Sequence, residues 1–199
     1  MTTADSTPTA DQLDTDARRK LRDELLAALA LLVAGLAEDL ATGSITLDEW
    51  ESAMRDQIKD ALGMAYVFGR GGLDQMTDAD WHALSGLVVA AYMYLDQFAT
   101  DIEQSLLSEA AIAARSEMYI GAGVGAYERG QASALDLYLP VYPGDDCEGM
   151  TNCRCWWDVN ELGDGSMEAI WHCEDDKESC DVCIAHGEEF NPLFIAVAA

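Results

Sequence analysis

Lysine is scarce in this chain, and basic residues are few compared with acidic ones. The 199 residues include 11 lysines and arginines against 37 aspartates and glutamates, which gives a formal net charge of −26. Binding to duplex DNA needs clustered lysine and arginine side chains that neutralise phosphates. Anionic membrane surfaces attract proteins through the same kind of basic patch. We therefore expect neither direct duplex DNA binding nor membrane binding.

A halophilic setting is one interpretation of this composition. Only Lys20, Lys59 and Lys177 are lysines, and high salt screens the self-repulsion that so acidic a surface creates. An acidic protein encoded by a GC-rich mesophilic genome has the same composition. Both interpretations stay open at this point.

Long hydrophobic runs and a secretion signal are also lacking. The one long apolar run, Leu25 to Ala37, is too short to span a bilayer and indicates a buried helix. The segment from Met1 to Gln12 is polar and acidic, without the basic and apolar regions of a signal peptide. We expect no export, and in a reducing compartment thiolate–metal bonds are favoured over disulfides.

The overall pattern predicts a mainly α protein, a helical bundle followed by a small cysteine-rich subdomain. Residues 1–13 lack a periodic apolar pattern, and we expect them to form a disordered tail. Residues 14–138 are expected to form the bundle. Its first helix is predicted from about Asp14 to near Gly43, where leucines recur at spacings of three and four.

Two N-terminal caps predict the next two helices. Thr46 and Glu49 have the spacing of a capping box, which opens a helix running toward Phe68. Three glycines are expected to end that helix: Gly69, Gly71 and Gly72. Thr77 offers the second N-cap, and the apolar pattern after it predicts a third helix that ends near Thr100.

A fourth helix is predicted from around Ser105 or Ser108 to Arg129, although it contains several glycines. These are Gly121, Gly123 and Gly125. Each glycine lowers helix stability by about 1 kcal/mol relative to alanine, unless a neighbouring helix packs closely there. We favour close packing over a phosphate-binding loop, because the Gly-Lys-Ser/Thr of such a loop is missing.

Residues 139–199 predict a small α+β subdomain of zinc-knuckle or zinc-ribbon type. Pro140, Pro143 and Gly144 mark its boundary with the bundle. Its expected elements are a β-hairpin with strands at 156–159 and 168–171, a short helix at 181–190, and an apolar end at 193–197 that packs back on the bundle.

All six cysteines lie in this subdomain, together with two of the three histidines. Zinc prefers four tetrahedral ligands, and the Cys-x-x-Cys spacing lets two thiolates face one ion. We expect a structural zinc ion whose ligands come from a set of five cysteines: Cys147, Cys153, Cys155, Cys180 and Cys183. Three other side chains have the chemistry to substitute: His172, Cys173 and His186. Disulfides and unlinked core cysteines remain alternatives.

Catalysis is not indicated by any motif. Catalytic zinc sites keep an open position near a carboxylate base, and the His-Glu-x-x-His pattern is missing. His186 and Glu188 resemble the His-x-Glu of zinc deaminases, but the Cys-x-x-Cys here precedes that element instead of following it. Walker, Rossmann and Gly-x-Ser-x-Gly motifs are also missing. We therefore expect no enzymatic activity, with a zinc-dependent hydrolase or nuclease as the alternative.

Four segments between roughly residues 80 and 193 carry motifs that resemble those in the same chain region of a known family. They are 106–130, 139–147 with Leu-Pro-Val-Tyr-Pro-Gly-Asp-Asp-Cys, 151–156 with Thr-Asn-Cys-Arg-Cys-Trp, and 180–193 with Cys-x-x-Cys and Phe-Asn-Pro-Leu. This series resembles the minor head, or head morphogenesis, proteins of tailed phages and prophages. In the related Mu F-like minor head family, Cys-x-x-Cys precedes a His-Pro-Asn-Cys-Arg-Cys segment, whereas the order is reversed here.

The resemblance implies a virion component that acts near the portal or inside the capsid during head assembly, without an enzymatic activity of its own. Its implied partners are other virion proteins, such as the portal, the major capsid protein or head-completion proteins, and it would be assembled in the host cytoplasm. A cytosolic adaptor that uses the same zinc-stapled subdomain to hold a protein partner is a further alternative.

Overall fold

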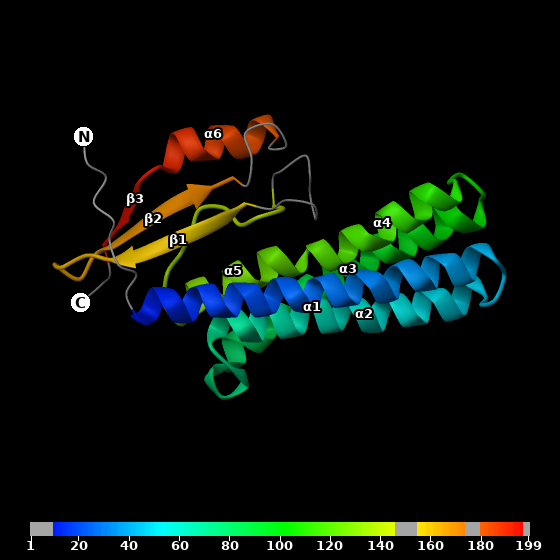
Figure 1. Ribbon diagram of the computed structural model, residues 1–199, viewed down its shortest axis with the longest axis horizontal. Coiled ribbons are helices and arrows are strands. Elements are labelled where there is room, and N and C mark those ends of the chain that lie inside the picture. The colour runs from blue at the N-terminus through cyan, green and yellow to red at the C-terminus, as the bar shows by residue number, and fades with distance from the viewer. Residues whose placement is uncertain (1–9, 146–154, 174–179, 197–199) are drawn as a thin grey trace.

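The chain forms a bundle of antiparallel helices, followed by a small sheet that one helix covers (Figure 1). The computed structural model describes residues 10–145, 155–173 and 180–196. The elements are α1 (Ala10–Ala41), α2 (Leu47–Arg70), the 3-10 helix η1 (Leu73–Gln75), α3 (Asp78–Glu103), α4 (Glu109–Gly121), α5 (Gly123–Ala134), β1 (Trp156–Glu161), β2 (Met167–His172), α6 (Asp181–Phe190) and β3 (Leu193–Ile195). The prediction of a mainly α protein with a small C-terminal sheet is confirmed. None of the helices in the described ranges has the length and hydropathy needed to cross a bilayer.

The predicted capping box at Thr46 and the predicted N-cap at Thr77 are both present. The Thr46 hydroxyl accepts from the Glu49 backbone N–H at 3.3 Å, and the Glu49 carboxylate accepts from the Thr46 N–H at 2.8 Å. Thr77 and Asp80 make the same exchange at the start of α3, at 3.2 and 2.8 Å. These side chains satisfy backbone donors that the first helical turn leaves unpaired. The two helices therefore begin where the sequence predicts.

Four boundaries differ from the predictions. Helix α1 already begins at Ala10, so residues 10–13 belong to it and not to a disordered tail; residues 1–9 lie outside the described ranges. Gly69 lies inside α2, and Gly71 ends that helix with a left-handed φ of 96°. The predicted fourth helix consists of two helices, α4 and α5, which meet at Ala122.

The fourth difference concerns the apolar C-terminal segment. We expected residues 193–197 to pack back on the bundle, but residues 193–195 form β3 and pair antiparallel with β2. Leu193 and Ile195 pack on the core of the C-terminal subdomain. The reason is that β2 offers a free row of backbone donors and acceptors, which an extended segment satisfies by hydrogen bonding.

Helix α2 and the α4–α5 pair form the centre of the bundle, and α1 and α3 pack on them from two sides. Gly69 of α2 and Gly130 of α5 allow the close approach of these two helices. A Cβ atom at Gly69 would lie 2.0 Å from the Tyr127 carbonyl oxygen, and one at Gly130 would lie 2.2 Å from the Tyr66 carbonyl oxygen. The predicted close packing against a neighbouring helix is confirmed at Gly123, where a Cβ would lie 2.5 Å from Leu26 of α1. At Gly125 the close neighbour is instead the Pro143 carbonyl oxygen, which would lie 2.5 Å from a Cβ there and is outside any helix.

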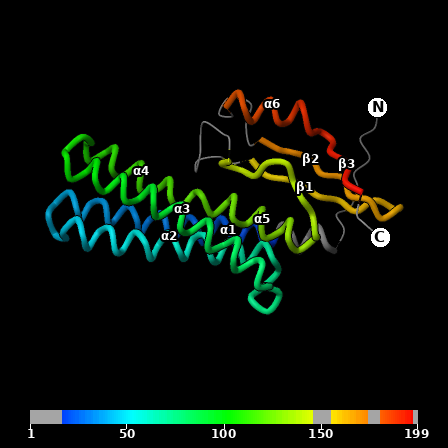
Figure 2. The backbone as a smooth tube through the Cα atoms, turned by 180° about the vertical axis from the view of Figure 1, so that it is seen from behind, coloured from blue at the N-terminus to red at the C-terminus, as the bar shows by residue number. Residues whose placement is uncertain are grey.

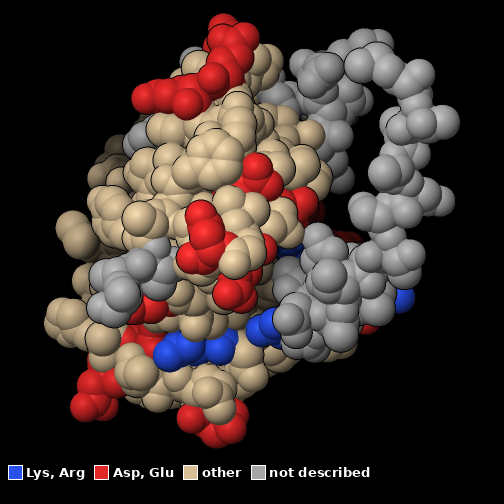
Figure 3. Space-filling model, turned by 90° about the vertical axis from the view of Figure 1, so that its left-hand side faces the viewer, with Lys and Arg blue, Asp and Glu red and all other residues tan. Residues whose placement is uncertain are grey.

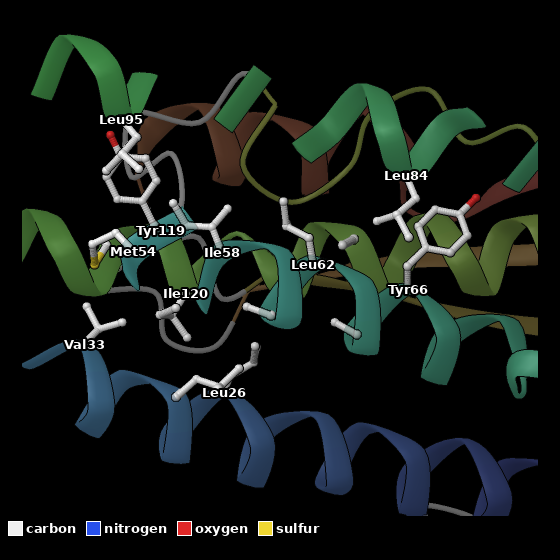
Figure 4. Packing of buried hydrophobic residues seen from close by; sticks show 14 of the residues in the cluster. Leu26, Val33, Met54, Ile58, Leu62, Tyr66, Leu84, Leu95, Tyr119 and Ile120 are labelled. Carbon is white, nitrogen blue, oxygen red and sulfur yellow. The ribbon is translucent and has the colours of Figure 1, made fainter. Parts of the chain in front are cut away.

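The bundle core consists of aliphatic and aromatic side chains from α1 to α5 (Figure 4). Val33, Met54 and Ile58 are fully buried, and Trp50 meets Phe98 edge-on with ring centroids 5.3 Å apart. Burial of apolar surface contributes about 25 cal/mol per Å². This core therefore supplies most of the driving force that folds the bundle.

The C-terminal sheet has the strand order β1-β2-β3, with both pairs antiparallel. Trp157 lies opposite Trp171, and their side chains point to the face that α6 covers. Successive side chains of a strand alternate between faces, so Cys155 and Cys173 point the same way as these tryptophans. The side-chain amide of Asn191 donates to the Trp171 carbonyl at 2.8 Å and accepts from its N–H at 2.6 Å, which extends the sheet beyond β3.

Candidate metal centre

The covered face of the sheet is a small aromatic core. Trp157 and Trp171 are buried with ring centroids 5.1 Å apart, and Phe190 of α6 packs against Trp157. The indole N–H of Trp157 donates to the Val141 carbonyl at 2.9 Å, and that of Trp171 donates to the Cys183 carbonyl at 3.1 Å. Because both indole donors are satisfied, the tryptophans pack without a desolvation penalty.

Cys155 and Cys173 lie next to each other at one end of this core. Cys155 immediately precedes β1 and Cys173 immediately follows β2, so the hairpin register brings them together. Their Sγ atoms are 3.4 Å apart, and Cys155 is buried. A disulfide needs about 2.05 Å, whereas two thiolates on one tetrahedral zinc ion with bonds of about 2.3 Å lie about 3.8 Å apart. At this separation the two sulfurs are not joined by a disulfide, and the Cys155 thiol donates a hydrogen bond to Cys173 Sγ.

Cys180 and Cys183 lie at the start of α6, beside the same end of the sheet. Cys180 is the N-cap residue, and Cys183 follows within the first turn and is buried. The Cys173 thiol donates to the Cys183 carbonyl at 3.5 Å, and all four cysteines belong to one apolar cluster. The partial positive charge of a helix N-terminus favours anionic ligands such as thiolates there.

The two histidines of the subdomain make other contacts. His172 lies on the opposite face of the sheet, stacked on Trp156 at 5.1 Å, with its Nε2 3.0 Å from Oδ2 of Asp158. His186 packs between Trp171 and Phe190, with ring centroids 5.6 and 5.5 Å away. Strand alternation therefore directs His172 away from the face that carries Cys155 and Cys173, and His186 is packed among aromatic rings.

Among the predicted ligands, the structure places Cys155, Cys180 and Cys183 in one cluster. Cys147 and Cys153 lie outside the described residues. Within residues 10–145, 155–173 and 180–196, no group of three or more histidine, cysteine or acidic side chains is arranged to hold a metal ion.

Cys173 is the member of this cluster that the predicted five-cysteine set leaves out. The feature that predicts its place beside Cys155 is the register of the hairpin. In an antiparallel pair, a cysteine just before the first strand lies opposite the residue just after the second.

No family model, curated protein sequence or solved structure matches this chain.

The cysteine-bearing sheet is joined to the bundle through its free edge at β1. The Trp157 N–H donates to the Glu128 carboxylate of α5 at 3.3 Å, and Arg19 of α1 donates to the Trp157 carbonyl. The same guanidinium donates to the Asp158 carboxylate at 2.6 Å. An exposed strand edge would leave these backbone groups unpaired. Bundle side chains therefore satisfy the edge and fix the position of the subdomain.

Glu128 is the buried centre of this junction. Its burial raises the pKa of the carboxyl group to about 7, against the opposing effects of Arg19 and Arg22 and of the Trp157 N–H. Arg22 Nη1 lies 3.4 Å from Glu128, and its guanidinium covers the Tyr127 ring at 4.8 Å.

Figure 3 looks at the end of the molecule that carries the hairpin turn, where carboxylates are scattered and basic side chains gather in one band. Acidic and basic groups are therefore matched at the junction in spite of the large net charge.

Proposed function

We propose that this protein is a non-enzymatic assembly component of a tailed-virus head, a minor capsid or portal-proximal protein whose C-terminal subdomain is held by a structural zinc ion. The observation that carries the proposal is the Cys155–Cys173 sulfur pair, 3.4 Å apart. The pair lies inside the segment whose sequence resembles minor head proteins, and it is packed among apolar side chains. Its buried setting suits a structural role, because a closed tetrahedral site needs no access for substrate.

In this proposal, Cys155 and Cys173 supply two of the four zinc ligands. The other two come from the remaining cysteines: Cys147, Cys153, Cys180 and Cys183. Zinc would then join the hairpin to the start of α6, and this bond would stabilise a subdomain whose apolar core is small. His172 and His186 make aromatic contacts, so the proposed donors are all cysteines. Such a donor set is typical of structural zinc and not of a catalytic ion with an open position.

Metal content and coordination test the zinc part. The full chain, purified under reducing conditions, is expected to hold one zinc ion by elemental analysis, and the cobalt-substituted protein is expected to show the absorption of sulfur-rich tetrahedral coordination. The double variant Cys155→Ser with Cys173→Ser should lose the metal, whereas His172→Gln should keep it as a matched control. A folded chain without metal, or with its cysteines paired as disulfides by mass spectrometry, contradicts structural zinc. Coordination that includes an exchangeable water and supports hydrolysis contradicts the non-enzymatic role.

Location in particles tests the virion part separately. If the proposal holds, the gene of this chain lies beside a portal gene, and mass spectrometry of purified virions or of purified head-assembly intermediates detects the protein. Recovery only from host cytosol, away from particles and assembly intermediates, contradicts the assembly role and favours an adaptor. This outcome leaves the zinc result unaffected, so the two parts of the proposal are judged independently.

A further inference from the structure

The hydrogen-bonding pattern of the β1–β2 hairpin is defined by its two central tryptophans. The Trp171 N–H and carbonyl bond to the side chain of Asn191, and the Trp157 N–H and carbonyl bond to side chains of the bundle. The two tryptophans are paired across the hairpin, yet their backbone groups point away from each other. Trp157 and Trp171 therefore form a non-hydrogen-bonded pair of the antiparallel ladder.

Cys155 and Cys173 occupy the next position of the same kind. Hydrogen-bonded and non-hydrogen-bonded pairs alternate along an antiparallel ladder, and the pair of Trp156 and His172 lies between the two positions. Continuing the register by one residue places Cys155 directly opposite Cys173. Residues of a non-hydrogen-bonded pair have Cα atoms about 4.5 Å apart, and disulfides join residues with Cα separations from about 4.4 to about 6.8 Å. The strand backbone therefore allows a bond between the two sulfurs.

The two thiols are in contact but differ in their access to solvent. Cys155 Sγ donates to Cys173 Sγ at 3.4 Å, so no other group separates them. Cys155 is buried, whereas Cys173 is only partly buried. Figure 2 shows the open end of the hairpin near the start of α6, on the side away from the hairpin turn. A small oxidant therefore meets Cys173 first, and the second thiol lies within reach of it.

We propose that Cys155 and Cys173 are a redox site, a dithiol that a small-molecule disulfide converts into a cross-strand disulfide. The Cys173 sulfur loses its proton, attacks one sulfur of the reagent and displaces the other, which leaves as a thiol. The Cys155 sulfur then loses its proton, attacks Cys173 Sγ and displaces the second reagent thiol. The cysteines together lose two hydrogens and two electrons, and the reagent disulfide is reduced to two thiols.

The redox site goes beyond the proposed structural zinc and does not require it. A zinc ion held by Cys155 and Cys173 would be released when the sulfurs join, because thiolates are the metal ligands. Oxidation also removes the S–H group that Cys173 donates to the Cys183 carbonyl at 3.5 Å. The disulfide would therefore close the hairpin and weaken its contact with the start of α6. For a virion component, which is the proposed function, this change would follow exit from the reducing cytoplasm.

Peptide mapping of the full chain tests the redox site. The protein is purified reduced and exposed to hydroxyethyl disulfide, a neutral reagent that the net charge of −26 does not repel. Samples taken over time are quenched with iodoacetamide, digested and mapped by mass spectrometry, and a chromogenic chelator records any zinc released. The same reaction in urea is the control. There, neighbouring cysteines such as Cys180 and Cys183 should pair first, because shorter loops close at a lower entropy cost.

The expected first product of the folded chain is the Cys155–Cys173 disulfide, with a mass loss of two hydrogens that a dithiol reductant reverses. Cys155→Ser should stop at a mixed disulfide between Cys173 and the reagent, because the second attacking thiol is gone. The double variant Cys180→Ser with Cys183→Ser is the matched control and should still form the link. Circular dichroism establishes that each variant is folded, and mapping of the unaltered chain decides the question by itself if one is not.

The possible failures of the redox site and of the zinc ion are distinguishable. First pairing of Cys180 with Cys183 in the folded chain, or recovery of Cys155 and Cys173 as alkylated thiols after prolonged exposure, overturns the redox site. A zinc-loaded chain that resists oxidation in this way leaves the structural zinc in place. A metal-free chain that forms the Cys155–Cys173 link supports the redox site and contradicts the zinc ion alone.

Discussion

Arg19 in α1 and Asp158 in β1 are joined by a 2.6 Å contact between Nη1 and Oδ1. The second terminal nitrogen of the same guanidinium donates to the Trp157 carbonyl. The arginine side chain is 14% exposed and that of Asp158 is 41% exposed, so the guanidinium lies largely out of water while its carboxylate partner is partly solvated. A planar guanidinium holds a carboxylate and a backbone oxygen at once, which a lysine ammonium does not reproduce. One side chain of the bundle therefore fixes two adjacent residues of the sheet edge.

Replacing Arg19 by alanine is expected to destabilise the protein by about 2 kcal/mol, because the Trp157 carbonyl loses its donor and Asp158 loses its counter-charge. Arg19→Lys should recover less than half of this. Urea unfolding followed by tryptophan fluorescence measures both. Lys20→Ala is the matched control, since the neighbouring side chain is 78% exposed and pairs with Glu24 at 3.9 Å. If Arg19→Ala lowers the free energy of unfolding no more than Lys20→Ala does, the junction does not depend on this arginine.

Glu128→Gln is expected to change how stability depends on pH. Burial raises the pKa of Glu128 to about 7 in the folded protein, above the value of about 4.3 in an unfolded chain. Its contribution is therefore fully present below about pH 4.3 and is lost as pH rises through about 7. The variant should gain stability relative to the unaltered chain between about pH 5 and pH 8, by about 4 kcal/mol at most.

Chemical denaturation at several pH values measures this difference. Glu109→Gln, at an exposed position in the first turn of α4, is the control and should track the unaltered chain across the same range. A free-energy difference that stays constant with pH for Glu128→Gln would contradict the expected titration.

Asp80 is expected to be the polar residue on which the bundle depends most. It accepts from Tyr66 at 3.1 Å, from Arg70 at 3.0 Å and from Ser133 at 2.5 Å, in addition to its role in capping α3. Burial acts to raise its pKa, but the hydrogen bonds from Ser133, Thr77 and Arg70 outweigh burial and hold the pKa well below its usual value. Asp80→Asn should destabilise the protein by about 2 to 3 kcal/mol at neutral pH.

The pH dependence of stability that Asp80 causes has the opposite sign to that caused by Glu128. A carboxyl with a lowered native pKa stabilises the fold above its unfolded pKa of about 3.9, and this contribution is lost as pH falls toward the native pKa. Thermal unfolding between about pH 2.5 and pH 6 should show a shallower acid-side loss in Asp80→Asn than in Asp78→Asn, an exposed carboxylate in the same helical turn. Equal acid-side slopes would mean that Asp80 does not carry this dependence.

Gly130→Ala and Gly63→Ala are expected to have opposite effects. A methyl group at Gly130 would lie 2.2 Å from the Tyr66 carbonyl oxygen, so α2 and α5 must separate, at a cost of about 3 kcal/mol. A methyl group at Gly63 meets nothing within 4 Å among the described residues and should stabilise α2 by up to about 1 kcal/mol. Differential scanning calorimetry compares the two substitutions. Similar changes in melting temperature would contradict the close α2–α5 packing.

Local signals in the sequence predict the helix starts and the hairpin well. Thr46 and Thr77 begin their helices because a hydroxyl and a carboxylate three residues later satisfy the same backbone groups wherever the pair occurs. The position of Gly69 inside α2 was not predictable, because the compensating contact comes from Tyr127, far along the chain. The Arg19 and Glu128 junction has no local pattern either, since its geometry exists only once β1 lies beside the bundle.

In the candidate metal centre too, some features follow from local sequence and others only from the fold. Cys-x-x-Cys at residues 180–183 is a local signal, and the start of a helix there agrees with it. The importance of Cys173 depends on which residue it faces across the hairpin, and that follows from the strand register. Counting spacings along the chain therefore finds part of the cysteine cluster, and strand pairing completes it.

The separation of 139 positions between Arg19 and Asp158 has a consequence for how the chain is made. A ribosome releases α1 long before β1, so the first helix leaves the exit tunnel with its arginine still hydrated. Glu128 also stays in contact with water until the hairpin closes over it, because the Trp157 N–H is one of its partners. These contacts of Arg19 and Glu128 can therefore form only after β1 has been synthesised, and until then both charged side chains stay hydrated.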